Sequence, residues 1–315
     1  MPKNFWKQLE RPILALAPMA GITDSAFRQI CRENGADVAY SEMASVSALF
    51  FKPARTLELL KFDSAERPYV VQLFGKDPAH FAKAAQIVTS QIKPDGLDIN
   101  FGCPAKKVFG HGSGCALMPQ PELAREIISA VCSNTDLPVS IKIRAGIKDT
   151  TAIHFIENIK DLPFTAVMVH GRTYEGGFSS TPDFTVAEEI KKIIPGKIVL
   201  ANGGIHTPED AKNILEKYPR IDGLGIARGA WGKPYLFAQI KEILAAGRCA
   251  EYDFARIRKI AIRHAESLWK NKDATGMLEI RKHLAWYFKG FPNASELRQK
   301  LVRAGSVEEI RDILK

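Results

Sequence analysis

The stretch DGLDINFGCPAKKVFGHGSGCAL, residues 95–117, holds the local pattern around which the rest of the chain is organised. It opens with a strand-length apolar run, Leu97–Asn100, and breaks at Gly102, where Cys103 stands before Pro104. Because proline disfavours the helical region for the residue before it, Cys103 is predicted in extended backbone at the end of a strand. A thiol beside flexible glycines and two lysines is a candidate chemical centre, and a buried cysteine at a tight turn is the alternative.

Similar strand-like runs occur on both sides of this stretch, alternating with helix-like segments between residue 13 and about residue 245. The strand-like runs are apolar throughout, as in a parallel sheet buried on both faces, and several helices carry proline in their first turn. Predicted strands span residues 13–17, 38–41, 69–74, 97–100, 139–143, 166–170, 198–202 and 222–227. Predicted helices span residues 24–33, 78–91, 121–133, 151–160, 182–193, 208–217 and 235–245.

Eight such units over about 230 residues predict an α/β fold, a closed (β/α)8 TIM barrel. A doubly wound sheet is the competing fold, but neither GxGxxG after the first strand nor GxxxxGK[ST] occurs in the chain. Residues 253–315 contain no strand-like run and show helical periodicity over residues 254–270, 277–288, 294–301 and 307–314. We therefore expect a catalytic barrel domain over residues 1–246 and an all-helical C-terminal domain over residues 247–315.

The composition, 46% apolar and 25% charged, is ordinary for a globular protein. No apolar run approaches the roughly 20 residues of a membrane span. The N-terminus lacks the apolar core of a signal peptide, so we expect a cytoplasmic protein without membrane attachment. The five cysteines are scattered without a CxxC pair, which argues against a disulfide framework and against a metal site. Cys31 and Cys132 fall in apolar helical patterns and are predicted to be inert core thiols.

The net charge of +9 is distributed unevenly along the chain. Residues 250–315 hold 14 Lys and Arg against 9 Asp and Glu, more than half of the basic excess. Such an excess is compatible with a polyanionic partner such as nucleic acid, and an ordinary sign bias of a solvated surface is the alternative. We expect the protein to be a monomer.

Polar residue types are concentrated where the predicted strands end, which is where active sites lie in TIM barrels. Each has a structural explanation when taken alone: Lys142 could pair with Asp98 or Glu42, and His170 could be a satisfied core histidine. Burying so many polar groups at one mouth is unfavourable, however, so together they indicate a functional site. The residues at or near the strand ends are Glu42, Gln72, Asp98, Asn100, Cys103, Lys142, Arg144, His170, Arg172, Asn202 and Arg228.

The last two loops suggest what kind of group is bound. Gly203-Gly204 and Ala227-Arg228-Gly229 follow the seventh and eighth strands, where barrels commonly hold a phosphate on backbone amides. Glycine lets the backbone approach closely, and the arginine adds positive charge. The pattern fits flavin mononucleotide (FMN), pyridoxal phosphate or a sugar phosphate equally well.

Several longer motifs resemble those of the tRNA-dihydrouridine synthase family, both in the barrel and toward the tail, and the GCP motif with its lysines is the most specific. Two departures touch the phosphate loops: Ala227 stands where many members have glycine, and Gly204 where some have an acidic residue. The motifs are APMAGITDSAFR at 17–28, SEM at 41–43, VQLFG at 71–75, DINFGCPAKKV at 98–108, KIRAG at 142–146, VHGRT at 169–173, ANGGI at 201–205 and GIARGAWGKPYLF at 225–237.

This resemblance implies an FMN enzyme that reduces uridine in tRNA to 5,6-dihydrouridine, with NADPH as the reductant. It implies that Gln72 contacts the pyrimidine edge of the flavin and that Lys142 stabilises the anionic reduced ring. Asn100, Arg172 and Lys106 would contact the substrate. The other cofactor-binding residues would be Pro18, Met19 and Ala20 at the ring, and His170, Asn202, Gly203, Gly204, Ala227 and Arg228 around the phosphate.

The resemblance also gives Cys103 a role, because hydride addition at C6 of uracil leaves C5 in need of a proton. A thiol with a pKa near 8.5 is mostly protonated at neutral pH and can donate that proton. A covalent nucleophile would instead need a lowered pKa, which Lys106 or Lys107 could supply. The family likeness favours the general acid.

The basic tail is expected to grip the phosphates of tRNA and so offset the unstacking of the target base. The rival functions are a dihydroorotate-dehydrogenase-like enzyme acting on a free pyrimidine, a lyase using Lys142 as a Schiff base, and a non-catalytic RNA-binding protein. The preference for NADPH over NADH rests on the resemblance alone. The candidate tRNA contacts are Arg256, Arg263, Arg281, Lys282 and Arg298.

Overall fold

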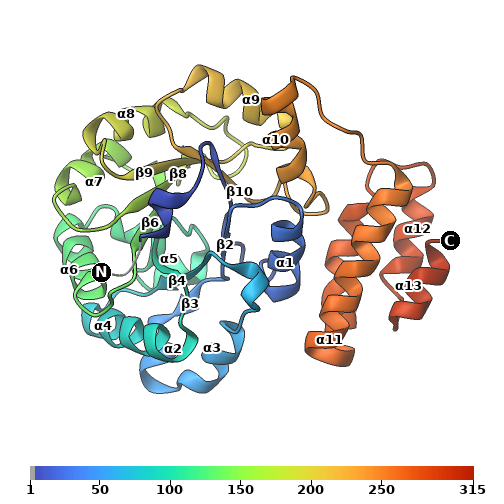
Figure 1. Cartoon of the computed structure of the whole chain (residues 1–315). Coiled ribbons are helices and arrows are strands. Elements are labelled where there is room, and N and C mark those ends of the chain that lie inside the picture. The colour runs from blue at the N-terminus through green and yellow to red at the C-terminus, as the bar shows by residue number, and fades with distance from the viewer. Residues whose placement is uncertain (1–3) are drawn as a thin grey trace.

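The computed structural model describes residues 4–315, which form a barrel with a group of helices beside it (Figure 1). Eight parallel strands make the barrel, and it closes because β1 pairs with both β10 and β2 while β2 pairs with β4. The predicted TIM barrel is therefore confirmed. Its strands are β1 (Ile13–Leu16), β2 (Val38–Tyr40), β4 (Tyr69–Phe74), β5 (Gly96–Phe101), β6 (Val139–Ile147), β8 (Ala166–Thr173), β9 (Ile198–Asn202) and β10 (Gly223–Ile226).

Helices cover the outside of the barrel, and side chains at their starts cap them. Asp24 and Thr207 accept hydrogen bonds from backbone N–H groups in the first turns of α1 and α9. The helix predicted from residue 182 begins instead at Thr185, because the backbone N–H of Asp183 bonds the carbonyl oxygen of Gly171. These helices are α1 (Ser25–Glu33), α4 (Pro78–Ile87), α6 (Pro121–Cys132), α7 (Ala152–Ile159), α8 (Thr185–Ile193), α9 (Pro208–Lys217) and α10 (Leu236–Ala246).

Several short elements were not predicted. The strands β3 (Ala44–Ser45) and β7 (Thr150–Thr151) extend the sheet beside β4 and β6. The helices α2 (Val46–Phe51) and α3 (Pro53–Leu59) fill the connection between β3 and β4. Runs this short do not span enough residues to display helical periodicity, which explains why the sequence pattern missed them.

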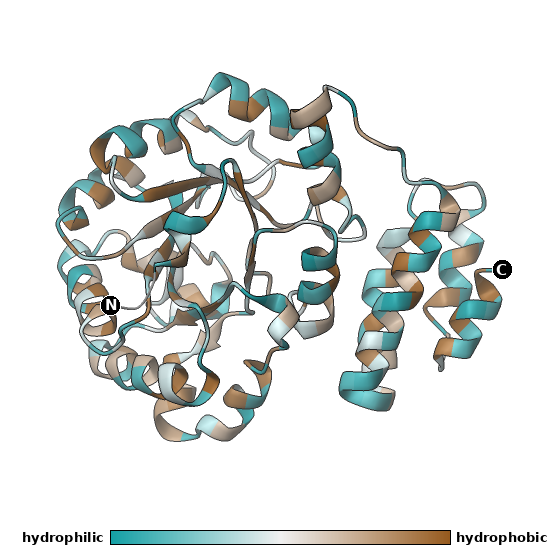
Figure 2. Cartoon of the chain, viewed as in Figure 1, coloured by the Kyte–Doolittle hydropathy of each residue, from teal (hydrophilic) through white to brown (hydrophobic). Residues whose placement is uncertain are grey.

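One end of the barrel is closed by apolar side chains. Phe5 and Trp6, in the short helix η1 (Phe5–Gln8), pack against inward-facing residues such as Ile13 and Ile198. This dark blue segment crosses the end of the barrel that faces the viewer in Figure 1. Figure 2 shows apolar strands surrounded by helices whose hydrophilic residues lie on the outside. With that end filled by described side chains, the cavity lies at the mouth formed by the carboxyl ends of the strands.

The remaining helices form a second group with a core of its own, built from residues such as Ile257, Ile280 and Ile310. Residues 247–253 connect it to α10, and α11 packs against α1. The two helices predicted over residues 254–270 and 277–288 meet at Asp273, whose φ of 47° and ψ of −133° break the helix. The helices are α11 (Phe254–Tyr287), α12 (Ala294–Leu301) and α13 (Val307–Ile313). Across residues 4–315, no helix has the length and apolar character needed to cross a membrane.

Candidate active site

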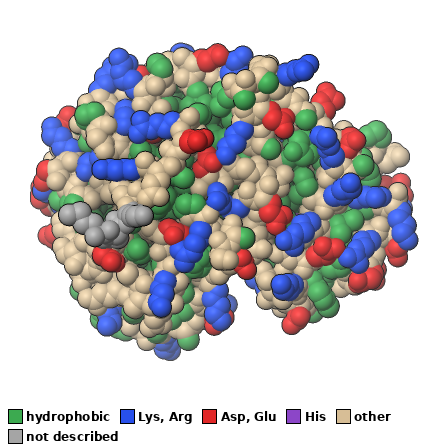
Figure 3. Space-filling view, in the orientation of Figure 1, with side chains coloured by type: hydrophobic (Ala, Val, Ile, Leu, Met, Phe, Trp, Pro, Cys, Tyr) green, Lys and Arg blue, Asp and Glu red, His purple; other side chains and the backbone are tan. Residues whose placement is uncertain are grey.

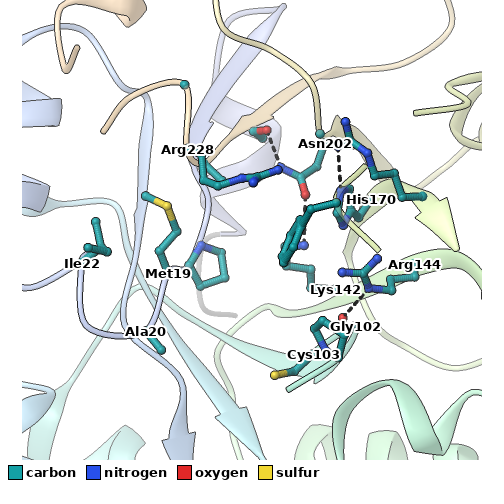
Figure 4. Close-up of a pocket in the computed structure, with 18 of the residues that line it drawn as sticks. Met19, Ala20, Ile22, Gly102, Cys103, Lys142, Arg144, His170, Asn202 and Arg228 are labelled. Carbon is teal, nitrogen blue, oxygen red and sulfur yellow. Dashed lines mark hydrogen bonds between the residues drawn. The ribbon is translucent and has the colours of Figure 1, made fainter. Parts of the chain in front are cut away.

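A cavity of about 330 Å³ opens at the mouth of the barrel, where the strands end (Figure 4). Lys106 does not line it: the structure places this exposed residue at the start of the short helix α5 (Lys106–Gly110). All other predicted site residues line the cavity, namely Pro18, Met19, Ala20, Gln72, Asn100, Cys103, Lys142, His170, Arg172, Asn202, Gly203, Gly204, Ala227 and Arg228.

Strand pairing places the polar side chains in one row across the mouth. Asn100 on β5 is paired with Lys142 on β6, and His170 on β8 is paired with Asn202 on β9. Because alternate residues of a strand point to the same side, residues two positions apart line the cavity together. In Figure 4, Met19, Ala20 and Ile22 lie on one side of the cavity, opposite Lys142, Arg144 and His170.

A chain of buried hydrogen bonds leads from the barrel interior to Cys103. Ser140 Oγ donates to Asp98 Oδ1 at 2.6 Å, and Gln72 Nε2 donates to Asp98 Oδ2 at 2.7 Å. Asn100 Nδ2 donates to Gln72 Oε1 at 2.9 Å. Asn100 Oδ1 in turn accepts from the backbone N–H of Cys103 at 2.9 Å. The carboxylate of Asp98 thus orients both amides, and Asn100 fixes the backbone that carries the thiol.

Burial of Asp98 raises its pKa to about 6, against the opposing effects of the hydrogen bonds from Ser140 and Gln72 and the charge of Lys142. The side-chain amide of Gln72 therefore uses its oxygen and one N–H group in hydrogen bonds inside the barrel. One further N–H of Gln72 remains for a ligand in the cavity.

The thiol of Cys103 is half-buried beside the cavity. Burial raises its pKa, and the opposing effects of the Ala105 backbone N–H and the Arg144 and Lys142 charges do not overcome it. Its loop is fixed by Arg144 Nε, which donates to the carbonyl oxygen of Gly102 at 3.0 Å (Figure 4). A thiol in this setting is protonated at neutral pH and can act as a proton donor.

The cavity wall carries several positively charged side chains, those of Lys142, Arg144, Arg172 and Arg228. Burial, with the charge of Arg144, lowers the pKa of Lys142 to about 8, and the Lys142 ammonium donates to Asn202 Oδ1 at 3.1 Å. The ion pairs considered from the sequence, Lys142 with Asp98 or Glu42, are not formed. Burial and the neighbouring Lys142, Arg144, Arg172 and Arg228 lower the pKa of His170 to about 2.

Four cationic side chains therefore line a cavity that, within the described chain, no Asp or Glu lines. Gly203 and Gly204 form the adjacent loop with φ values of +110° and +68°. A Cβ atom on Gly203 would lie 2.6 Å from His170 Cδ2, so only glycine leaves this end of the cavity open. This arrangement fits an anionic group such as a phosphate.

Several cavity-lining residues were given no binding or catalytic role from the sequence, among them Arg144, Phe178 and Trp231. Arg144 was grouped with the polar residues near the strand ends, and because it follows Lys142 by two positions on β6, the period-two rule for strands could have placed it in the cavity. Phe178 lies in the loop after β8, and its ring, 56% exposed, packs 4.3 Å from the guanidinium carbon of Arg228. Trp231 lies after β10. Neither aromatic residue has a periodic pattern that would place it at the cavity, although Trp231 lies within the motif at residues 225–237.

No group of three or more His, Cys, Asp or Glu residues in the part of the chain that the structure describes could hold a metal ion. All five cysteines are free thiols, with Cys31 buried in α1 and Cys132 half-buried in α6.

Comparisons with known proteins identify the family of this chain. A family model described as dihydrouridine synthase (Dus) matches residues 15–314. The chain is 35% identical to tRNA-dihydrouridine synthase B of Shewanella oneidensis, over 87% of this chain and 85% of that protein. It is 34% identical to tRNA-dihydrouridine synthase B of Pseudomonas aeruginosa, over 92% of this chain and 88% of that protein. A solved structure titled "Crystal structure of TcOYE with pHBA" shares the fold at a TM-score of 0.53 and 8% identity, covering 77% of this chain and 91% of that one. The chain belongs to the dihydrouridine synthase family.

Proposed function

We propose that this protein reduces uridine in tRNA to 5,6-dihydrouridine, with FMN as the bound cofactor and NADPH as the reductant. The observation that carries the proposal is a thiol, Cys103, whose pKa is raised by burial and which lies at the edge of a cavity lined by four cationic side chains. Membership of the dihydrouridine synthase family supports the reaction, and the names of the relatives support tRNA as the substrate.

The residues present fit a phosphate-bearing flavin. The open glycine loop at Gly203 and Gly204, with Arg228 and His170 beside it, would hold the phosphate. The remaining N–H of Gln72 would meet the polar edge of the ring, and Met19 and Ala20 would pack on it. Pro18, Asn202 and Ala227 would complete the pocket. When bound, the reduced flavin supplies a hydride to C6 of the uracil ring.

The chain's own residues supply charge and a proton. Lys142 holds a positive charge in the cavity wall, where it stabilises negative charge on the cofactor ring. Cys103 delivers the proton that C5 of uracil needs, and Asn100 keeps its backbone in place. Arg172 lies at the same mouth and would contact the uracil.

The role of the helical tail rests on its exposed cations, and the structure narrows the list. Arg263 is paired with Glu33 of α1 at 2.8 Å, and Arg281 donates to the carbonyl oxygens of Arg303 and Ala304. These two side chains therefore join separate segments of the chain, whereas Arg256 and Arg298 donate to nearby backbone carbonyl oxygens, those of Glu251 and Ala294. Figure 3 shows Lys and Arg interspersed with Asp and Glu on the visible face of the tail. We propose that the exposed Arg256, together with Arg298 and Lys282, contacts tRNA phosphates.

Three measurements test this proposal. Heat-released cofactor identified by chromatography should be FMN, and unmodified tRNA incubated with NADPH should gain dihydrouridine detectable by mass spectrometry. The variant Arg256→Glu/Arg298→Glu should bind tRNA more weakly and with a shallower salt dependence. A protein that purifies without flavin, or that leaves tRNA unchanged while reducing a free pyrimidine, would contradict the proposal.

A further inference from the structure

We infer that Trp231, Trp286 and Lys289 form a stacking site for a nucleotide next to the target uridine. The inference rests on the proposed function, because it identifies where the RNA strand leaves the catalytic cavity. The site joins the barrel to the helical tail: Trp231 lines the cavity in the loop that also carries Arg228, and Trp286 lies on α11.

The first step is the position of the two indole rings. Trp231 lines the cavity, from the loop after β10, and its ring lies 4.8 Å from that of Trp286 on α11, with 31° between the ring planes. Gly232 makes this approach possible, since a Cβ atom there would lie 2.6 Å from the backbone of Trp286. The aromatic pair is thus a fixed feature of the junction and reaches from the cavity wall to the surface.

The second step is what the outer ring offers to a ligand. Trp286 is 40% exposed, and the ammonium of Lys289 lies 4.8 Å from its ring centroid. Lys289 forms no ion pair in residues 4–315. Stacking of a base on an aromatic ring is stronger than an exposed cation–π contact, so a base can replace the flexible ammonium. The displaced ammonium then remains beside the base, where it can meet a phosphate.

The third step is what the inner ring offers. The indole N–H of Trp231 is buried, so a ligand in the cavity does not reach it as a donor. Trp231 therefore offers its aromatic surface, and the two indole rings together form a stacking surface at this edge of the cavity.

The physical need for such a site comes from base extrusion. A uracil that enters the cavity leaves its stack, and the neighbouring base then loses a stacking partner. An exposed tryptophan at the edge of the cavity can replace that partner. A nucleotide therefore fits the site better than an aliphatic protein surface, which would use neither the aromatic face for stacking nor the free cation of Lys289.

The experiment compares Trp286→Ala with Trp269→Ala in the full-length holoenzyme. Trp269 is a matched control: it also lies on α11, before the break at Asp273, is 43% exposed, and neither lines the cavity nor stacks on another ring in the described chain. The probes are unmodified tRNA for Kd, KM and kcat. We expect Trp286→Ala to raise Kd and KM about tenfold or more with a smaller effect on kcat, and Trp269→Ala to change neither by more than twofold.

Further variants separate stacking from damage to the domain junction. Trp286→Phe keeps an aromatic face and should recover most of the affinity, whereas Trp286→Leu keeps apolar bulk and should not. Unchanged tRNA affinity in Trp286→Ala, equal losses in Trp286→Ala and Trp269→Ala, or full recovery by Trp286→Leu would each overturn the inference. The wild-type protein tests the proposed function separately, since tRNA reduction by wild type with unaltered affinity in Trp286→Ala refutes only the stacking site.

Discussion

Replacing Cys103 by alanine separates the proton donor from the rest of the site. The backbone N–H of Cys103 is held by Asn100 Oδ1 at 2.9 Å, and Arg144 Nε holds the neighbouring Gly102 carbonyl oxygen at 3.0 Å. Neither bond uses the thiol, so Cys103→Ala should keep the loop in place. The side chain is only half-buried, which limits the packing that is lost.

The expected loss follows from what a positioned general acid contributes. Such groups typically accelerate a reaction by about 10²–10⁴-fold. At about 1.36 kcal/mol for each tenfold change, this corresponds to roughly 2.7–5.4 kcal/mol in the activation barrier. Cys103→Ala should therefore bind flavin and oxidise NADPH at a normal rate but form dihydrouridine at least 100-fold more slowly.

The assay is a single turnover of pre-reduced enzyme with unmodified tRNA, followed by quantification of dihydrouridine. The pH dependence of the rate is an independent test, because the two possible roles of Cys103 change the rate in opposite directions as the pH rises. Because burial raises the pKa of the Cys103 thiol, a general acid gives a rate that is flat through neutral pH and falls as the pH passes that pKa. A thiolate nucleophile would give a rate that rises with pH. A wild-type rate in Cys103→Ala, or a rate that rises into the alkaline range in wild type, would refute the reasoning.

Three further substitutions test the cofactor cradle and the fold. Arg228→Met should weaken FMN binding about 10- to 150-fold, since hydrogen bonds to charged groups contribute about 1.5–3 kcal/mol, and an unchanged Kd in apoprotein titrations would contradict the phosphate assignment. Gly203→Ala should purify with less flavin and a lower Tm because its φ is +110°, whereas Gly196→Ala, at a site with open space, should match wild type. Arg28→Met leaves buried Glu66, its partner at 2.5 Å, without a counter-charge. It should reduce the free energy of unfolding by about 3–5 kcal/mol in urea titrations, and a loss below about 1 kcal/mol would show that the pair is not effectively buried.

The barrel could be predicted from the sequence because each buried parallel strand is a short apolar run bounded by breakers, and eight such runs recur. The connection that contains α2 and α3 could not, because the two helices span only 6 and 7 residues. The break at Asp273 within α11 likewise depends on how the tail packs, while the helical segments on either side of it were visible as periodic patterns.

Most of the candidate site could be predicted because polar residues at strand ends share one mouth in this fold. The polar residues that face the inside of the barrel were harder to predict. The strands were described as apolar throughout, whereas Asp98 and Asn100 on β5 lie on the inward face and belong to one hydrogen-bond chain. Lys106 was placed at the site by motif alone, but the turn after Pro104 carries it away from the cavity, on α5. The contact between Trp231 and Trp286 joins residues far apart in sequence, so no local pattern could reveal it.

The central claim is that the reduced cofactor in this barrel delivers its electrons to a uridine in tRNA. The most direct test is to reduce the bound flavin anaerobically, add unmodified tRNA or orotate, and follow the flavin absorbance. The account predicts fast reoxidation with tRNA and none with orotate. Reoxidation by orotate alone would contradict it and would place the protein among reductases of free pyrimidines.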